Sequence, residues 1–177
     1  RIVTGIAKIV NTKMNGSFYD HIKDMNTDQE IFKTLISNFN NFEDTRTYNE
    51  KTIYFYKLAQ LLTSDFLQVI EIKEKRNVNY SNLLGCADYK IPQVMQSLGI
   101  LEYDTKLLSL LETKTEIEEN SEYEVEIRAS MLVVINYIYE QINKSIDRID
   151  INDFIWSKSQ DKTKKYKPYH LTRTTSY

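Results

Sequence analysis

The sequence predicts an all-α fold, and three observations support that prediction. Only 4 glycines and 2 prolines occur in 177 residues, well below the usual shares of about 7% and 5%. Such a composition disfavours a β-sandwich, which needs many tight turns. Apolar residues recur three and four positions apart in several segments, which is the period of an amphipathic helix. The length fits one domain or part of one, since a domain commonly has about 100–200 residues.

Three segments in the first half of the chain have the helical period: residues 1–14, 28–40 and 54–69. The first ends before Gly16, at a turn-forming Asn-Gly pair. The second follows Thr27, whose side chain is typical of a helix N-cap. The intervening segments without this period are predicted to be loops: residues 42–44 and 71–79.

Four more helical segments are expected in the second half: one from Pro92 to just before Gly99, a short one after Asp104, a long one over 123–146, and a short helix or turn at 154–156. Proline fits the first turn of a helix, and glycine fits the position just past its end. Turns or exposed loops are expected between them: residues 112–122, 147–153 and 161–167. Residues 168–177 are predicted to form either a short strand or an extended tail that lies on the helices.

Composition also narrows the possible partners. The 23 basic and 25 acidic side chains give a formal net charge of -2, which disfavours binding of polymeric nucleic acid through its phosphates. No apolar run reaches the roughly 18 residues that a membrane span needs. Cys86 is the single cysteine and there are two histidines, so neither an internal disulfide nor a zinc cluster is expected. We expect an intracellular protein, and a single small phosphate could still be bound.

Arg128 is the most informative anomaly, because it completes the apolar stripe of the long helix over residues 123–146. A guanidinium group keeps its charge, so on an apolar face it must meet a carboxylate, carbonyl groups or a bound anion. Glu124 precedes it by four residues and is a ready partner on the same face. We favour this ion pair, with a supporting structural role, over direct contact between Arg128 and a ligand.

Two further charged residues have both a chemical and a structural interpretation. Asp88 follows a Gly-broken connection between helices, where a carboxylate can act in catalysis, although its spacing favours a role as the cap of the next helix. Lys57 lies on the flank of an apolar helix face. It could bind a phosphate, although a lysine that extends from such a flank into solvent is commoner.

Trp156 and His170 are weaker candidates. The indole of Trp156 could stack on a base, but aromatic side chains more often fill a core. His170 could act as a general acid or could be a surface residue, and its neighbours in the sequence favour neither interpretation.

Four ordered motifs resemble the queuosine salvage proteins, the queuosine 5′-monophosphate N-glycosylase family. They are residues 54–65, which begin Tyr-Phe-Tyr-Lys and end in aspartate; residues 87–94, Ala-Asp-Tyr-Lys-Ile-Pro-Gln-Val; residues 124–129, Glu-Val-Glu-Ile-Arg-Ala; and the tail from residue 154 to the final tyrosine. A weaker likeness covers residues 15–18 and 42–44. Leu58 and Lys90 depart from the family pattern, which usually has arginine at both positions.

The resemblance implies a helical fold distantly like that of the DNA glycosylases. It also implies hydrolysis of the N-glycosidic bond of queuosine 5′-monophosphate, with release of queuine and ribose 5-phosphate and with salvage of the queuine into tRNA. No metal or organic cofactor is implied, and we expect a cytoplasmic monomer that acts on this small molecule. By position in the motifs, Asp88 and Lys57 are then the catalytic residues, and Tyr89 forms part of the substrate-binding wall. Trp156 and His170 are further substrate-binding candidates. Arg128 and Glu124 support the residues of the site without contacting the substrate themselves.

Family members have a substantial region before the point that corresponds to Arg1. We therefore expect residues 1–177 to be the C-terminal portion of a single catalytic domain whose N-terminal portion is absent. In the family that region contributes part of the base-recognition pocket. The competing interpretations are a non-catalytic helical interaction module, an inactive fragment or a degenerate relative. A glycosylase that acts on polymeric nucleic acid is disfavoured by the charge.

Overall fold

The structure is a computed structural model that describes residues 2–177. It is mostly helical, as the sequence predicts, and the described residues form eight α-helices, one short 3₁₀ helix and one β-hairpin. In chain order these are α1 (Ile2–Lys13), α2 (Phe18–Ile22), α3 (Asp28–Asn38), η1 (Asn40–Phe42), β1 (Thr45–Tyr48), β2 (Lys51–Tyr54), α4 (Lys57–Glu74), α5 (Lys90–Ser97), α6 (Thr105–Glu112), α7 (Glu122–Gln141) and α8 (Arg148–Ser159). None of these helices is long and apolar enough to cross a bilayer.

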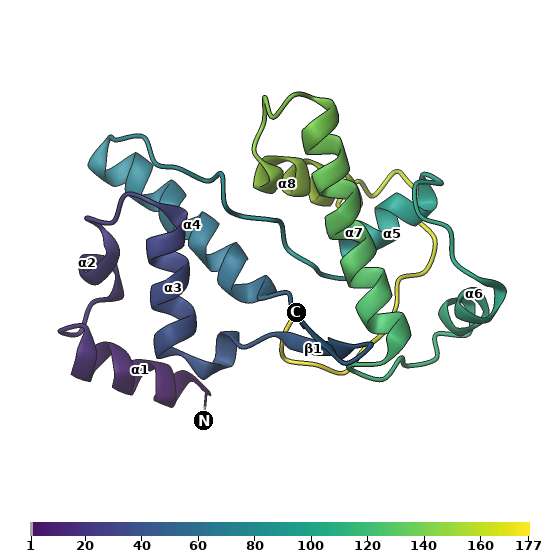
Figure 1. Ribbon diagram of the computed structural model, residues 1–177, viewed down its shortest axis with the longest axis horizontal. Coiled ribbons are helices and arrows are strands. Elements are labelled where there is room, and N and C mark those ends of the chain that lie inside the picture. The colour runs from purple at the N-terminus through teal and green to yellow at the C-terminus, as the bar shows by residue number, and fades with distance from the viewer. Residues whose placement is uncertain (1) are drawn as a thin grey trace.

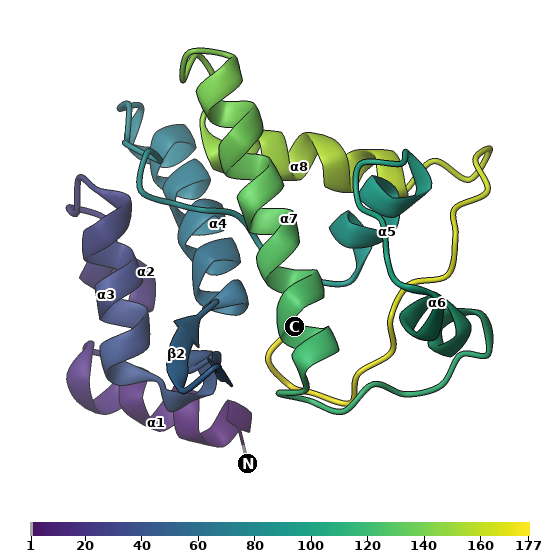
Figure 2. The same cartoon turned by 45° about the vertical axis from the view of Figure 1, so that its right-hand side comes forward.

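Apart from α6, which packs in a small cluster of its own, the helices form two groups, which lie on opposite sides of the connection between α4 and α5 (Figure 1). The first group, α1–α4, surrounds one apolar cluster: Met14, Ile22, Ile31, Leu35, Phe39, Leu67 and Ile70. The second group, α5, α7 and α8, encloses another: Phe55, Ala87, Ile91, Met95, Val125, Met131, Ile135, Tyr139 and Ile151. Figure 2 shows the same separation from a second direction, with α7 and α8 on the far side of the connection from α3. A site at the junction of the two groups can therefore contain residues from both of them.

The sequence prediction missed the hairpin and placed part of it in a helix. Thr45 pairs with Tyr54 and Tyr48 with Lys51 in an antiparallel register. The turn between the strands has positive φ at both central residues, 47° at Asn49 and 62° at Glu50. This geometry usually selects glycine at the second position. The absence of glycine concealed the turn, and the predicted helix from residue 54 in fact begins at Lys57.

Three other boundaries were also wrong. The long helix predicted over residues 123–146 ends at Gln141. The predicted loop over residues 71–79 is helical up to Glu74, because Ile70 completes the apolar face of α4 in the first core. The predicted turn over residues 147–153 is mostly the first half of α8, which begins at Arg148. That helix buries the polar Asn152 beside Ile149 and Ile151, so a simple apolar period does not mark it.

The capped helices and the tail were predicted more accurately. Thr27 and Glu30 form a reciprocal capping box at the start of α3, and the Asp104 carboxylate accepts a bond from a backbone N–H of α6. Two alternatives were predicted for residues 168–177, and the structure shows the extended tail. Within the described chain their single β-bridge joins Leu171 to Glu116, and these ten residues form no strand.

Candidate active site

The connection that leads into α5 is anchored by side chains from three helices. The amide oxygen of Gln60 on α4 accepts two consecutive backbone N–H bonds from this connection, at 2.6 and 3.3 Å. Asn152 on α8 accepts the backbone N–H of Cys86 at 2.8 Å. Arg128 on α7 donates from Nε to the carbonyl oxygen of Ala87 at 2.9 Å. Both helical groups therefore fix the backbone that leads directly to Asp88.

A glycine lets this connection pass close to α7. Gly85 has φ of +118°, which residues with a side chain rarely adopt. A Cβ at this position would lie 3.2 Å from Cδ1 of Ile135 and 3.3 Å from the side-chain oxygen of Asn152. The backbone conformation favours glycine here, and the close approach leaves little room for a Cβ.

Asp88 caps α5 with one carboxylate oxygen and leaves the other available. Its Oδ1 accepts the backbone N–H bonds of Lys90 at 2.8 Å and Ile91 at 3.2 Å. Asp88 thus satisfies the first N–H groups of α5 as a cap would, although Tyr89 is the residue at the N-cap position. No hydrogen bond from residues 2–177 reaches Oδ2. Burial raises the pKa of Asp88, whose side chain is 7% exposed, and the two backbone bonds and the charge of Lys57 act in the opposite direction.

Lys57 is the first residue of α4, and its charge acts on Asp88 and on a second carboxylate. Within the described chain its ammonium group forms no hydrogen bond or ion pair with another side chain. The positive charge lowers the pKa values of both Asp88 and Asp65, although burial raises each of them by more. The half-buried Lys57 thus lies within electrostatic range of Asp88, with its ammonium group available to a ligand.

Asp65 on α4 and Asp153 on α8 extend the site to the facing surfaces of these two helices. Both side chains are exposed, but partial loss of hydration raises the pKa of each carboxyl group, and the charge of Asp65 raises that of Asp153 further. Burial raises the thiol pKa of Cys86 to about 12, and the charges of both carboxylates contribute to this effect, so Cys86 is no nucleophile at neutral pH. The part of the chain that the structure describes contains no group of three or more His, Cys, Asp or Glu side chains placed to hold a metal ion.

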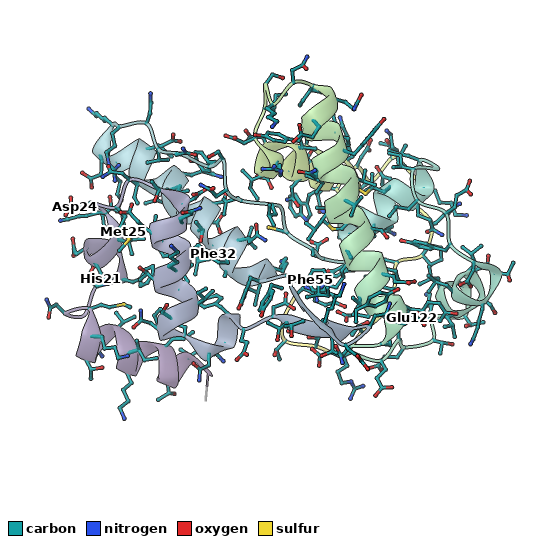
Figure 3. All side chains as sticks on the ribbon, viewed as in Figure 1. His21, Asp24, Met25, Phe32, Phe55 and Glu122 are labelled. Atoms are coloured by element: carbon teal, nitrogen blue, oxygen red, sulfur yellow. The ribbon has the colours of Figure 1, made fainter. Side chains whose placement is uncertain are left out.

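The predicted pair between Arg128 and Glu124 is present at 3.0 Å, but it is one part of a larger buried network. Asp44 binds the same guanidinium group with both carboxylate oxygens, at 3.0 and 2.6 Å. The rings of Phe55 and Tyr177 lie 4.0 and 4.2 Å from Cζ of Arg128. Phe55 is labelled in Figure 3 near the start of α4, at the junction of the two helical groups. Arg128 is therefore satisfied by protein groups and needs no ligand.

Tyr89 and Trp156 both offer aromatic surface near the connection. The Tyr89 ring packs on Tyr169 with the centroids 4.8 Å apart, and the Lys90 ammonium lies 4.7 Å from the Tyr169 ring. Trp156 is 45% exposed, so the interpretation as a core side chain is wrong. It follows Asn152 by one turn of α8, which places it on the same side of the helix as the residue that holds Cys86.

His170 is buried, so its interpretation as a surface residue is also wrong. Its Nε2 lies 3.2 Å from the hydroxyl oxygen of Tyr177. Burial lowers the pKa of His170 to about 4, and the charge of Arg128 contributes to this effect. The imidazole is thus neutral at pH 7 and does not supply an imidazolium proton there.

A cavity of about 380 Å³ lies next to the connection, between α3, α4 and residues 82–84. Its aromatic wall consists of Phe32, labelled in Figure 3, with Tyr54 and Tyr56. Neither Lys57 nor Asp88 lines this cavity. The candidate catalytic residues therefore lie outside this cavity, near the surface between α4 and α8.

Sequence reasoning missed Asp44 and Arg46, which complete the buried network. Arg46 contacts Glu124 at 3.0 Å and Asp44 at 3.3 Å. Arg46 belongs to β1 and Asp44 precedes that strand directly, so both were hidden with the unrecognised hairpin. The alternating Thr-Arg-Thr-Tyr pattern of β1 is the signal that could have revealed them.

Comparison with known proteins gives one family for this chain and one shared name for its relatives. The family model described as queuosine salvage protein matches residues 1–177. Three curated relatives are each named queuosine 5′-phosphate N-glycosylase/hydrolase. The protein from Dictyostelium discoideum is 27% identical over 182 positions, which cover 100% of this chain and 57% of the relative. Those from Sphaerobacter thermophilus and Bos taurus are 30% identical, and each match covers 100% of this chain and 56% of the relative.

The chain thus spans just over half the length of the curated relatives that it matches. The family match, in contrast, extends over every residue of the chain and includes the segments that carry Lys57, Asp88 and Arg128. The chain belongs to the queuosine salvage protein family.

Proposed function

We propose that this chain carries the catalytic groups of an enzyme that hydrolyses queuosine 5′-monophosphate to queuine and ribose 5-phosphate. Water adds across the N-glycosidic bond, so that the hydroxyl group goes to the anomeric carbon and a proton goes to the base. The released queuine is then available for salvage into tRNA. The observation that carries the proposal is Asp88, whose Oδ2 is available beside the charge of Lys57. The names of the relatives indicate the bond that is cleaved.

The chemistry requires a negative group close to the anomeric carbon. Cleavage of a sugar–base bond passes through an oxocarbenium-like state, and a carboxylate can stabilise that charge, trap it or activate the attacking water. Asp88 suits these roles because two backbone N–H groups fix Oδ1 and leave Oδ2 to face the substrate. Hydrolysis by water requires no cofactor.

The remaining residues of the proposed site bind or position the substrate. Lys57 contacts the 5′-phosphate, Tyr89 and Trp156 form aromatic walls, and the neutral His170 completes the pocket. Support for Trp156 comes from its exposed indole, and support for Tyr89 comes from its place directly after Asp88. We also infer a distant fold relationship to the DNA glycosylases and a reaction in the cytoplasm, in keeping with the helical content and with a substrate that is a free nucleotide.

The direct test is to incubate the full-length protein with queuosine 5′-monophosphate and to measure free queuine by mass spectrometry. We expect queuine and ribose 5-phosphate in equal amounts. The 177-residue chain is assayed in parallel. Release by the full-length protein alone would show that the further sequence present in the relatives is needed. No release by the full-length protein would contradict the proposal and favour an interaction module.

Replacement of Lys57 by alanine is expected to weaken binding of the nucleotide more than binding of the unphosphorylated nucleoside. The reason is that the ammonium group has no protein partner among the described residues and is available to the phosphate. We expect a loss of about 10- to 100-fold for the monophosphate, since a hydrogen bond to a charged group contributes about 1.5–3 kcal/mol and each 1.4 kcal/mol is about tenfold. Calorimetric titration with both ligands measures the difference. Lys73→Ala, which removes a lysine from the far end of α4, is the control, and equal losses for the two ligands in Lys57→Ala would rule out phosphate recognition.

A further inference from the structure

Asp44 joins the start of α4 to the buried arginine, although it was not among the predicted site residues. Its Oδ2 accepts the backbone N–H of Lys57 at 3.0 Å, and its two oxygens accept the bonds from Arg128 at 3.0 and 2.6 Å. The side chain of Asp44 is only 2% exposed. One buried carboxylate thus binds both the backbone of a proposed catalytic residue and the guanidinium group.

The other side of Arg128 reaches the second proposed catalytic residue. Its Nε donates to the carbonyl oxygen of Ala87 at 2.9 Å, and Ala87 directly precedes Asp88. A continuous path therefore runs from the Lys57 N–H through the Asp44 carboxylate and the guanidinium group to the backbone next to Asp88. The guanidinium is planar and presents its donors in a fixed arrangement. The rings of Phe55 and Tyr177 lie 4.0 and 4.2 Å from Cζ and restrict its movement.

The backbone of Asp44 also fixes the segment that leads into Lys57. Tyr56 precedes α4 with φ of +49°, an unusual conformation for a residue other than glycine. Its own side chain does not cap the helix. The backbone carbonyl of Asp44 instead accepts the N–H bonds of Phe55 and Tyr56, at 2.9 and 3.2 Å, while the carboxylate satisfies Lys57. The position of the first turn of α4 therefore depends on Asp44.

We propose that Asp44 is a positioning residue, which fixes Lys57 relative to Asp88 through Arg128. The inference rests on the proposed hydrolysis of queuosine 5′-monophosphate, for which these two residues supply the chemistry. Asp44 itself is buried beneath the site and acts through the groups that it holds. Its function depends on accepting hydrogen bonds at both oxygens, because every partner of the carboxylate is a donor.

Asp44→Asn in the full-length protein is the test. The amide places an NH₂ group against donors at one of the two oxygen positions. We expect kcat/KM for queuine release to fall by about 10- to 100-fold, the scale of loss from a displacement of about 1 Å at a catalytic group. The second measurement is the titration of Asp88, followed by ¹³C NMR of aspartate-labelled protein and assigned with Asp88→Asn. Lys57 and Lys90 are the cations that act on Asp88, and displacement of Lys57 should raise its pKa.

Arg46→Gln is the matched control for loss of the buried ion network. Arg46 contacts Asp44, Glu124 and Glu119, but it donates to neither Oδ2 of Asp44 nor the carbonyl of Ala87. We expect it to lower stability and to leave both kcat/KM and the Asp88 titration close to those of the wild type. Asp44→Glu, which keeps the charge but moves it, should have an intermediate effect.

The outcomes separate positioning from simple stabilisation. If Asp44→Asn and Arg46→Gln lose activity in parallel and the titration of Asp88 does not move, the positioning role is wrong. If Asp44→Asn does not fold, Asp44→Glu decides: a shifted titration supports the role, and an unchanged titration with unchanged kcat/KM contradicts it. If the wild-type protein releases no queuine, the proposed function fails, and the titration alone still shows whether Asp44 sets the distance from Lys57 to Asp88.

Discussion

Replacement of Asp88 by asparagine is expected to abolish queuine release and to leave the fold intact. Asparagine caps a helix about as well as aspartate, so the backbone N–H groups at the start of α5 keep an acceptor. The neutral amide, however, cannot offset positive charge on the ribose. We expect kcat to fall by at least about 100-fold, the usual effect of removing one group that stabilises charge in the transition state. Single-turnover assays of queuine release measure the loss, and the helical circular dichroism spectrum should not change.

Asp104→Asn is the matched control, because Asp104 also caps a helix but lies away from the site. Its Oδ1 accepts the backbone N–H of Leu107 at 2.8 Å at the start of α6. This variant should keep wild-type turnover. Asp88→Ala adds the loss of the cap and should lower stability by about 1 kcal/mol in addition to abolishing turnover. Turnover by Asp88→Asn within 10-fold of the wild type would remove the catalytic role and leave Asp88 as a helix cap.

Local sequence patterns sufficed for most of the helical fold. The caps at Thr27 and Asp104 and the glycine after α5 act within a few residues, so spacing alone revealed them. The hairpin escaped because Asn49 and Glu50 adopt positive φ without a glycine. The first half of α8 escaped because it buries Asn152, whose partner Cys86 lies 66 positions earlier. A buried polar side chain that serves a distant backbone group leaves no periodic signal.

The same distinction applies to the candidate site. Arg128 and Glu124 are one helical turn apart, so their ion pair could be predicted from spacing. Asp44 is 84 positions from Arg128, and only the fold brings them together. Lys57 and Asp88 were candidates from their positions in the sequence, and the family motifs implied their catalytic roles. The way in which one guanidinium group links their backbones through Asp44 required the structure. The exposure of a side chain likewise depends on the fold. Trp156 is exposed although a core position was favoured, and His170 is buried although a surface position was one of its two interpretations.

Replacement of Arg128 by methionine is expected to cause the largest loss of stability. Wild-type Arg128 and Arg46 balance the buried carboxylates of Asp44 and Glu124. The variant leaves one arginine with two buried carboxylates, and it leaves the carbonyl of Ala87 without its donor. Removal of one partner from a buried ion pair typically lowers the free energy of unfolding by about 3–5 kcal/mol. Urea unfolding followed by circular dichroism measures the change.

Arg148→Met is the control, because it removes an arginine whose contacts with neutral groups resemble those of Arg128. Arg148 donates to Asn136 and to the carbonyl of Ser81, and its Cζ lies 4.0 Å from the Tyr139 ring, but no carboxylate pairs with it among the described residues. Its loss should lower the free energy of unfolding by about 1 kcal/mol. A similar small loss in Arg128→Met would mean that Arg46 alone satisfies both carboxylates. In that case the contact between Arg128 and Ala87 would serve to orient Asp88 and would add little to stability, and the defect of the variant should appear in turnover instead.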